Sequence, residues 1–296
     1  MVSHMKRIHM SKRIILVIML FCTIWGIVLS ASDAFASGSG VIEIKTVEDL
    51  YNIRYDMAGS YILKNDIDLS QETAADGAYS FLGNGWDPIG SDSVYGNIEF
   101  TGSFNGNGHK IIGLNLNVTT VPSGASDYIY LGLFANNAGT IKNLTFVDGT
   151  ITKSYTGKHV YAGNAAGYNT GLIYNCNNYN TVNVQSNACI NRESSASGTQ
   201  RYVDSFAVVG GLIGFNEDGD LVRCNNYATI MVEAGSGNAS TATTRYNSIG
   251  TAGGIVGETS GDYTIELSSN MGQINARSTN GYVYAGGIAS QVLNLV

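Results

Sequence analysis

A short glycine-rich pattern recurs five times between Leu131 and the last residue of this 296-residue chain, and it constrains the possible folds more than any other feature. Its copies begin at residues 131, 163, 210, 253 and 286, so they lie 32, 47, 43 and 33 residues apart. A unit that recurs at such intervals is typical of a solenoid, in which each repeat forms one coil. The copies read Leu131-Gly-Leu-Phe-Ala135, Gly163-Asn-Ala-Ala-Gly167, Gly210-Gly-Leu-Ile-Gly214, Gly253-Gly-Ile-Val-Gly257 and Gly286-Gly-Ile-Ala-Ser290.

Further short apolar segments follow the copies of the pattern. They place Ile, Val or Leu at alternate positions, which is typical of strands with one buried face. Gly and Asn lie between the segments and tolerate the positive φ of tight corners. Three strands and three corners are therefore expected to form one coil of a parallel β-helix, whose inner face is buried by stacking. The first segment covers 139–144, 171–176 and 219–224, and the second covers 149–151, 180–182, 228–230 and 272–274.

The alignment of the copies predicts which residues point inward and where the additional length goes. Leu133, Ile213, Ile255 and Ile288 should be buried and should stack on neighbouring coils. The spacing varies because residues are inserted after the second segment, chiefly at 185–205 and 233–247. The insertions are expected to leave the solenoid at one corner and to cluster on one side.

The glycine-rich cores, followed by Gly171-Leu-Ile-Tyr-Asn-Cys-Asn-Asn-Tyr179 and its counterpart at 219–227, resemble the GLUG-type repeats of bacterial surface proteins. Such repeats also occur beside the protease domains of immunoglobulin-A-specific metallopeptidases. Residues 61–69 and 100–116 resemble the stretches that usually precede the repeats. The resemblance covers most of 41–296 and implies a β-helix. It implies no particular activity, since such repeats occur in proteins of diverse function.

The expected architecture is all-β, a right-handed parallel β-helix with a short N-terminal capping helix. Thr46 and Asp49 match a capping box, which predicts a helix from Val47 to about Met57. This helix should cover the open end of the coils, because exposed strand edges invite aggregation. The remaining upstream elements are predicted strands at 61–69, 98–104 and 110–118, with turns at 86–90 and 105–108.

Three regions are expected along the chain. Residues 1–36 form a signal peptide, 37–130 the cap and first coils, and 131–296 the repeat coils. The last unit stops at Val296 without its following segments, so the repeat coils are expected to be truncated at the C-terminus.

The start of the chain has the composition of an export signal. Four basic residues within the first 13 precede the uncharged, mostly apolar run 14–30, and Ala34-Phe-Ala36 offers a cleavage site before Ser37. The alternative is a membrane anchor that is retained, because the apolar run is nearly long enough to span a bilayer.

Charge narrows the possible partners. Without residues 1–36 the chain has 12 basic and 22 acidic residues, a formal charge of −10. This balance excludes the basic surface that nucleic-acid phosphates require and fits an exported protein. The expected partners are a glycan or protein on a host or bacterial surface, with membrane contact only through an uncleaved signal. The expected location is extracellular or on the bacterial cell surface.

Cys176 and Cys224 occupy the same place in consecutive units, whereas Thr145 and Ser268 were aligned with it in the other two. Neighbouring strands are about 4.8 Å apart, so the two thiols should lie one above the other. Three interpretations stay open: small buried residues in a ladder, a disulfide, or a metal-binding or catalytic thiol. The following residues should stack likewise as ladders: Asn177 with Asn225, Asn178 with Asn226, and Tyr179 with Tyr227.

The search for catalytic residues is mostly negative. His109 and His159 are the histidines after the signal, and neither belongs to a His-Glu-x-x-His motif. No nucleophile elbow or phosphate-binding loop occurs. Two groups of acidic residues could be functional. Asp66 and Asp68 face one way on a strand, and Glu217, Asp218 and Asp220 could bind Ca²⁺ in a turn. The alternative for both groups is that they are solvated or capping carboxylates. No other cofactor is expected.

Three hypotheses of function follow. The first is a non-catalytic surface module for adhesion or recognition, with its contacts on the insertions, because loops on a rigid scaffold usually carry binding. The second is a structural spacer of a larger surface protein. The third is a polysaccharide lyase or glycosidase on a β-helix scaffold. The candidate binding residues of the first hypothesis are Arg192, Arg201, Tyr202 and Tyr246.

Overall fold

The computed structural model describes residues 40–293 except for 75, 81–84, 92–97, 118–127, 157, 188, 192–200, 204, 236–247 and 280. The chain divides into two compact units after Gly40, and every other described residue lies in the second unit, Val41–Val296. The predicted signal peptide falls outside the described residues. Within the described part, no helix has the length and apolar character needed to cross a membrane.

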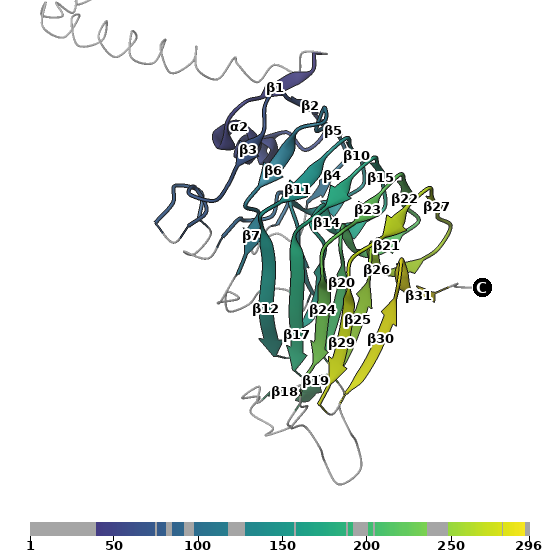
Figure 1. Ribbon diagram of the computed structural model, residues 1–296. Helices are drawn as coiled ribbons and strands as arrows, with labels where there is room; N and C mark the ends of the chain where they lie inside the picture. Colours follow the sequence, from purple (N-terminus) through teal and green to yellow (C-terminus); the bar gives the residue numbers. More distant parts are fainter. Residues whose placement is uncertain are drawn as a thin grey trace, which may run out of the picture. The chain divides into compact units, whose positions relative to one another are not determined.

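The second unit is a parallel β-helix, which confirms the predicted fold class. Five parallel sheets run through the coils, and the strands within each sheet are stacked in chain order (Figure 1). A complete coil passes through sheets A, B, C, E and D in turn. Each coil therefore has five strands, and the expected three strands per coil were wrong.

The strands of each sheet have the following bounds. Sheet A contains β1 (Ile42–Ile44), β2 (Ser60–Leu63), β5 (Ser103–Asn105), β10 (Thr140–Lys142), β15 (Leu172–Tyr174), β22 (Asp220–Val222) and β27 (Ile265–Glu266). Sheet B contains β3 (Ile67–Asp68), β6 (Lys110–Ile112), β11 (Thr145–Val147), β16 (Asn177–Asn178), β23 (Asn225–Asn226) and β28 (Ser269–Asn270). Sheet C contains β7 (Asn115–Leu116), β12 (Thr150–Thr156), β17 (Thr181–Asn187), β24 (Ile230–Ala234) and β29 (Ile274–Ser278).

The other two sheets are formed by strands around the glycine-rich pattern. Sheet E contains β8 (Tyr128–Leu131), β13 (His159–Ala162), β20 (Ser205–Gly210), β25 (Ser248–Gly253) and β30 (Tyr282–Gly286). Sheet D contains β4 (Glu99–Phe100), β9 (Phe134–Asn137), β14 (Ala166–Asn169), β21 (Ile213–Glu217), β26 (Val256–Ser260) and β31 (Ala289–Leu293). A separate antiparallel hairpin pairs β18 (Cys189–Asn191) with β19 (Arg201–Val203).

Strands of sheets C and E lie on either side of the inserted segments. β17 continues to Asn187 and β20 begins at Ser205, so much of the predicted insertion 185–205 is strand. These strands of sheets C and E run side by side towards the hairpin (Figure 1). The sequence pattern does not reveal β20. Polar and apolar residues do not alternate in Phe206-Ala-Val-Val-Gly210, so no period of two is visible there.

The upstream strands are shorter and more numerous than predicted. The predicted strand 61–69 is divided into β2 and β3 by a corner, and 98–104 and 110–118 are divided in the same way. β1 was not predicted at all and pairs with β2 at the end of sheet A. Apolar alternation continues across these corners, which is why the sequence pattern merges neighbouring strands.

The predicted turn at 86–90 packs into the core. Trp86 and Ile89 are fully buried. The indole Nε1 of Trp86 donates to the carbonyl oxygen of Leu133 at 3.1 Å, and Ile89 forms a parallel bridge with Phe134. This segment therefore covers the edge of an early coil.

The N-terminal helix α2 (Val47–Asn52) begins at the predicted capping box. The Thr46 hydroxyl accepts from the Asp49 amide, and the Asp49 carboxylate accepts from the Thr46 amide. The helix is shorter than predicted, since the chain tightens into the 3₁₀ turn η2 (Ile53–Tyr55). Leu50 and Ile53 are fully buried in the common core, at the end of the stack where β1 lies (Figure 1).

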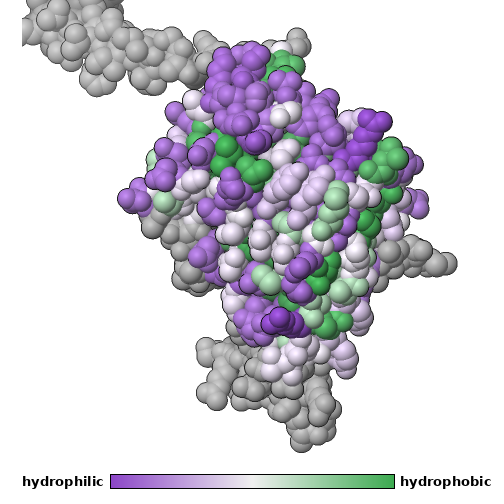
Figure 2. All heavy atoms as spheres, in the orientation of Figure 1, coloured by the Kyte–Doolittle hydropathy of each residue, from purple (hydrophilic) through white to green (hydrophobic). Residues whose placement is uncertain are grey.

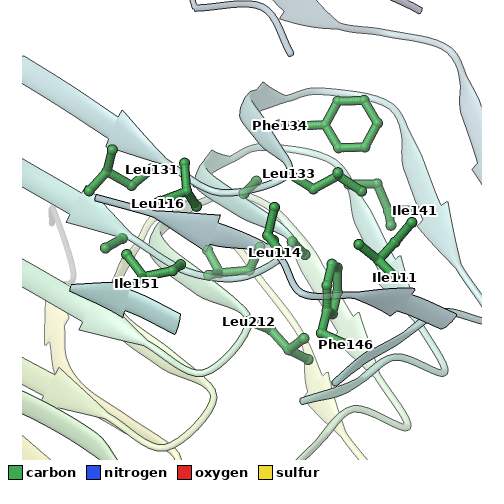
Figure 3. Packing of buried hydrophobic residues seen from close by; sticks show 14 of the residues in the cluster. Ile111, Leu114, Leu116, Leu131, Leu133, Phe134, Ile141, Phe146, Ile151 and Leu212 are labelled. Carbon is green, nitrogen blue, oxygen red and sulfur yellow. The ribbon is translucent and has the colours of Figure 1, made fainter. Parts of the chain in front are cut away.

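The interior is a column of aliphatic and aromatic side chains contributed by successive coils (Figure 3). Leu133, Ile213 and Ile255 are fully buried as predicted, whereas Ile288 in the last coil is half-buried. Ile213 is not in register with Ile255. Ile213 pairs with Val256, and Leu212 instead occupies the place of Ile255, whose carbonyl accepts from the Leu212 amide.

A left-handed residue forms the corner between sheets A and B in four successive coils. Asn143, Asn175, Arg223 and Leu267 have φ values of 55°, 53°, 57° and 50°. Asparagine tolerates this conformation, whereas other side chains with a Cβ are strained in it. The Asn175 amide also donates to the Asn143 side-chain oxygen at 2.9 Å, so the corner is both relaxed and hydrogen-bonded where it is asparagine.

Replacing Leu267 by asparagine should therefore stabilise the protein. Leu267 is 74% exposed, so the substitution removes little apolar burial, while it relieves a left-handed strain of about 1 kcal/mol. Equilibrium urea unfolding should show a higher midpoint for Leu267→Asn and a lower one for the β-branched control Leu267→Val. Equal midpoints for the two variants would contradict the assignment of strain to this corner.

Candidate functional site

The outer faces of sheets E and D carry most of the partly exposed aromatic side chains of the coils. Equivalent positions in successive coils form columns of side chains, because the parallel strands are in register. One column of sheet E contains Tyr128, His159, Phe206, Ile249 and Tyr282, and the next contains Tyr130, Tyr161, Val208, Thr251 and Tyr284. The facing column of sheet D contains Asn136, Tyr168, Phe215, Glu258 and Gln291.

A depression of about 390 Å³ lies where these columns meet, and we call it the aromatic groove. Val208 and Thr251 form its buried floor, and aromatic side chains line the rest together with Ile249, Glu258 and Gln291. The volume falls in the range of small-ligand sites, about 300–1,000 Å³. The groove is therefore large enough for a ligand of a few rings.

Glycines at the junction explain why the two sheets come so close. A Cβ on Gly214 would lie 2.5 Å from the backbone nitrogen of Ala162 in sheet E, and one on Gly257 would lie 2.8 Å from the backbone nitrogen of Val209 in sheet E. These are the final glycines of two copies of the repeated pattern. The glycines of the pattern thus allow sheets E and D to approach closely, and this approach shapes the groove above them.

Four rings pack into an aromatic cluster along one side of the groove. Tyr130 stacks on Tyr161 with ring centroids 5.5 Å apart, and Tyr168 stacks on Phe215 at 5.6 Å. The two pairs meet edge to face, with Tyr161 and Phe215 5.4 Å apart. Such offset and edge contacts are the favoured arrangements of aromatic rings, so the cluster holds its exposed ring faces in fixed positions.

A second stack of rings extends the groove across three coils. The His159 ring lies between Tyr128 and Phe206, with centroid distances of 4.9 Å and 4.7 Å. Tyr128 is 48% exposed, so this stack reaches solvent.

Two carboxylates accompany the rings. Glu217 accepts a short hydrogen bond from the Tyr168 hydroxyl. Glu258 lines the groove and is half-buried, and its loss of hydration raises its pKa above the ordinary value. Burial, with a smaller contribution from the Glu258 charge, also raises the pKa of Tyr161. Among the ion pairs between described residues, none involves Glu258.

The predicted binding residues on the insertions are only partly described. Arg201 and Tyr202 lie on β19, where their backbones pair with Asn191 and Ile190 of β18. Arg192 and Tyr246 lie outside the described residues. A loop site formed by these four residues therefore stays a prediction.

Cys176 and Cys224 lie in the core as free thiols. The disulfide interpretation is therefore wrong. Burial raises the pKa of both thiols, that of Cys224 to about 11. They remain protonated at neutral pH, which disfavours a nucleophilic or metal-binding role. The residue that matches Cys176 in the preceding coil is Leu144, and the alignment with Thr145 was wrong by one position.

The asparagines after these cysteines form two ladders. The buried Asn178 amide donates to Asn226 at 2.8 Å, and Asn226 donates to Asn270 at 2.7 Å. On the outer face of the same strands, Asn225 donates to Asn177 at 3.0 Å. The ladders join neighbouring coils through side chains in addition to the backbone.

Tyr179 and Tyr227 stack outside the coils next to these ladders. Their ring centroids lie 4.5 Å apart and their planes are within 5° of parallel. Tyr179 is 50% exposed and Tyr227 is 36% exposed. Because this stack lies away from the groove, it offers a matched control for substitutions within it.

The upstream acidic residues have separate structural roles. Asp66 lies at a corner, where it accepts from the Lys110 amide at 3.0 Å and lies 3.2 Å from the ring nitrogen of His109. Asp68 accepts from the amide and hydroxyl of Ser70. Both side chains are exposed on either side of the buried Ile67, although only Asp68 belongs to strand β3.

The acidic turn at 217–220 caps the next coil. Asp218 accepts from the Asp262 amide at 2.7 Å and Asp220 from the Thr264 amide at 2.8 Å. In the part of the chain that the structure describes, no three His, Cys, Asp or Glu side chains come together as a metal site would require. The geometry thus favours the alternative of capping carboxylates for these aspartates.

The comparisons with known proteins leave the family open. No family model matches the chain, and no solved structure matches it. A curated protein of Evansella cellulosilytica, named "Putative Gly-rich membrane protein", is 34% identical over 153 residues. This match covers 49% of the chain but 15% of the relative, so this chain spans a small part of that protein's length. The resemblance to GLUG-type repeats stays a prediction.

The groove residues were missed in the sequence, although a signal for them exists. Two ring-bearing residues lie two positions apart just before three copies of the glycine-rich pattern. They are Tyr128 and Tyr130, His159 and Tyr161, and Tyr282 and Tyr284. Such alternation places both rings on one face of a strand. It could have been found by extending the repeat alignment upstream by four residues.

Proposed function

We propose that this protein is an exported, non-catalytic module of the bacterial cell surface that binds a glycan in the aromatic groove. The observation that carries the proposal is the set of rigid, partly exposed rings around a depression of about 390 Å³. The relative from Evansella cellulosilytica bears the name of a membrane protein, which is compatible with a location at the cell surface.

The chemistry of the groove suits a sugar. A sugar ring has a face of weakly positive C–H groups, which the negative face of an aromatic ring attracts, and a rim of hydroxyls. Tyr161, Phe206 and Tyr284 supply ring surfaces, whereas Thr251, Gln291 and Glu258 supply hydrogen-bonding groups. A mostly apolar lining with a few polar groups is typical of small-ligand sites.

The face drawn in Figure 2 argues against broad apolar adhesion on that side of the molecule. Hydrophilic residues are concentrated there at the end of the stack that carries β1 and β2, and apolar residues form small separate patches. Large continuous apolar patches mark many protein interfaces, and this face has none among its described residues.

Removing the exposed groove rings should weaken glycan binding. The double variant Phe206→Ala/Tyr284→Ala loses two stacking surfaces, each worth about 0.5–1.5 kcal/mol by analogy with other aromatic contacts, so the affinity should fall about 5- to 140-fold. Affinity would be measured by glycan array and calorimetry on the purified protein. The control Tyr227→Ala removes a similarly exposed tyrosine outside the groove and should bind normally.

A hairpin deletion separates the groove from the insertions. Replacing 189–203 by a short Gly-Ser linker should leave the coils folded, since changes of loop length have small entropic costs. Binding should persist in this variant. Loss of binding there, with normal binding by the groove variant, would place the site on the insertions and refute the groove.

A polysaccharide-cleaving enzyme is the second candidate, and Glu258 favours it. Glycosidases use two carboxylic groups, one of which has a raised pKa so that it can donate a proton. Burial raises the pKa of Glu258, which is the direction that an acid catalyst needs, and Glu217 lies on β21 two residues from Phe215, the partner of Glu258. Chromatography of bound oligosaccharides after long incubation decides this point: shorter products that disappear in Glu258→Gln would establish cleavage.

A further inference from the structure

Glu258 is the charged side chain that the groove holds in a fixed place. It pairs in register with Phe215 on one side and Gln291 on the other, neither of which carries charge. From sheet E it is faced by Tyr161, Thr251 and Tyr284. A carboxylate that is half-buried without a cation is unfavourable, because its lost hydration is not replaced.

The remaining lining offers no fixed cation to balance it. Among the described residues that line the groove, none is Lys or Arg, and His159 is the one ring that can carry positive charge. The second carboxylate, Glu217, lies beside the aromatic cluster and accepts from Tyr168. The local charge is therefore complementary to a cation and repels an anion.

The aromatic rings strengthen this preference. An ammonium group close to the face of a tyrosine or phenylalanine ring is attracted by the ring's negative face, and more strongly where water is partly excluded. Tyr161 and Phe206 contribute ring surfaces within the same groove as the Glu258 carboxylate. A ligand ammonium could contact a carboxylate and a ring at once. A neutral hydroxyl in the same place would be attracted more weakly to both groups.

We infer that the groove selects glycans with free, positively charged amino groups, and that Glu258 receives the ammonium while the neighbouring rings stack on the sugar. This inference rests on the proposed glycan-binding function and adds its ligand class. Neutral and N-acetylated sugars bind more weakly because they leave the carboxylate unpaired. Sugars with carboxylate groups bind most weakly because they bring like charge to Glu258.

Calorimetry with three oligosaccharides of equal length tests this order. The probes are a β-1,4-glucosamine hexamer, its fully N-acetylated form and a galacturonate hexamer, in a slightly acidic buffer in which the amino groups are charged. The purified protein should bind the glucosamine hexamer at least about tenfold more tightly than the N-acetylated one, as expected for a charge-assisted hydrogen bond. Binding of the galacturonate hexamer should be the weakest.

Two isosteric substitutions locate the effect. Glu258→Gln keeps the shape of the side chain and should reduce the preference for the free amine to about twofold or less, with little change for the N-acetylated hexamer. Glu266→Gln removes one charge from an exposed side chain of β27 in sheet A and should keep the full preference. Circular dichroism confirms that both variants are folded.

The outcomes distinguish this inference from the function on which it rests. If no oligosaccharide in the panel or on an array binds, the proposed glycan recognition is overturned. If neutral or galacturonate hexamers bind as tightly as the glucosamine hexamer, or Glu258→Gln keeps the preference, glycan recognition stands and the amine selectivity is overturned. An equal loss of preference in Glu266→Gln would attribute it to overall charge and also overturn the role of Glu258.

Discussion

Ile213→Asp should prevent the repeats from folding. Ile213 is fully buried in β21, where it pairs with Ala166 and Val256 of the neighbouring coils. A carboxylate there would have no cation within the apolar column, and burial of an unpaired charge costs several kcal/mol. Natural domains are stable by about 5–15 kcal/mol in total. Circular dichroism should therefore show loss of the β-sheet signal or a strongly lowered melting temperature.

The conservative variant Ile213→Val gives the reference for this effect. It removes one methylene and should cost about 0.5–1.5 kcal/mol without changing the fold. A soluble Ile213→Asp protein that melts like Ile213→Val would show that the side chain at 213 points away from the core.

Asn226→Leu should cause the second-largest loss of stability. The Asn226 amide donates to the carbonyl of Ala228 and to Asn270, and its oxygen accepts from Asn178. Leucine has a similar size but can make none of these bonds. Each buried group left without a partner costs about 1–3 kcal/mol, so the free energy of unfolding should fall by about 2–5 kcal/mol. Equilibrium urea unfolding measures the difference.

The neighbouring residue supplies a matched control. Asn225 lies on the same strand but on the outer face, where it contacts Asn177 and Ser269 and is half-buried. Water can replace its lost bonds, so Asn225→Leu should cost no more than about 1 kcal/mol. Similar losses for both variants would mean that the inner ladder does not contribute more than the outer one.

Local features that depend on neighbouring residues were predictable from the sequence. The capping box at Thr46 and Asp49 starts α2 where predicted, because the groups that satisfy the first helical amides lie within four residues. The column of Ile151, Val182, Ile230 and Ile274 was likewise aligned correctly. A strict periodicity of two survives in these strands, and it determines which face is buried.

The register between coils around the glycine-rich pattern could not be determined from a period of two in the sequence. Gly163 pairs opposite Gly132, yet Ala166 pairs with Phe134, so the second coil has one more residue in its corner than the first. Several apolar residues follow one another in Leu212-Ile213 and Ile255-Val256, so a shift by one position still places an apolar residue inside. The register between the coils, in which Ile213 pairs with Val256, makes Leu212 the counterpart of Ile255.

The candidate site depends even more on tertiary structure. Tyr161, Phe215 and Glu258 are separated by 54 and 43 residues in the chain, and no spacing rule links them. By itself, the sequence determined that the chain forms stacked parallel coils, because a repeated glycine and aliphatic pattern allows no other way to bury its inner face. The tertiary structure decided that sheets E and D meet at close-packed glycines, since only the stacked backbone brings distant rings and a carboxylate around one groove.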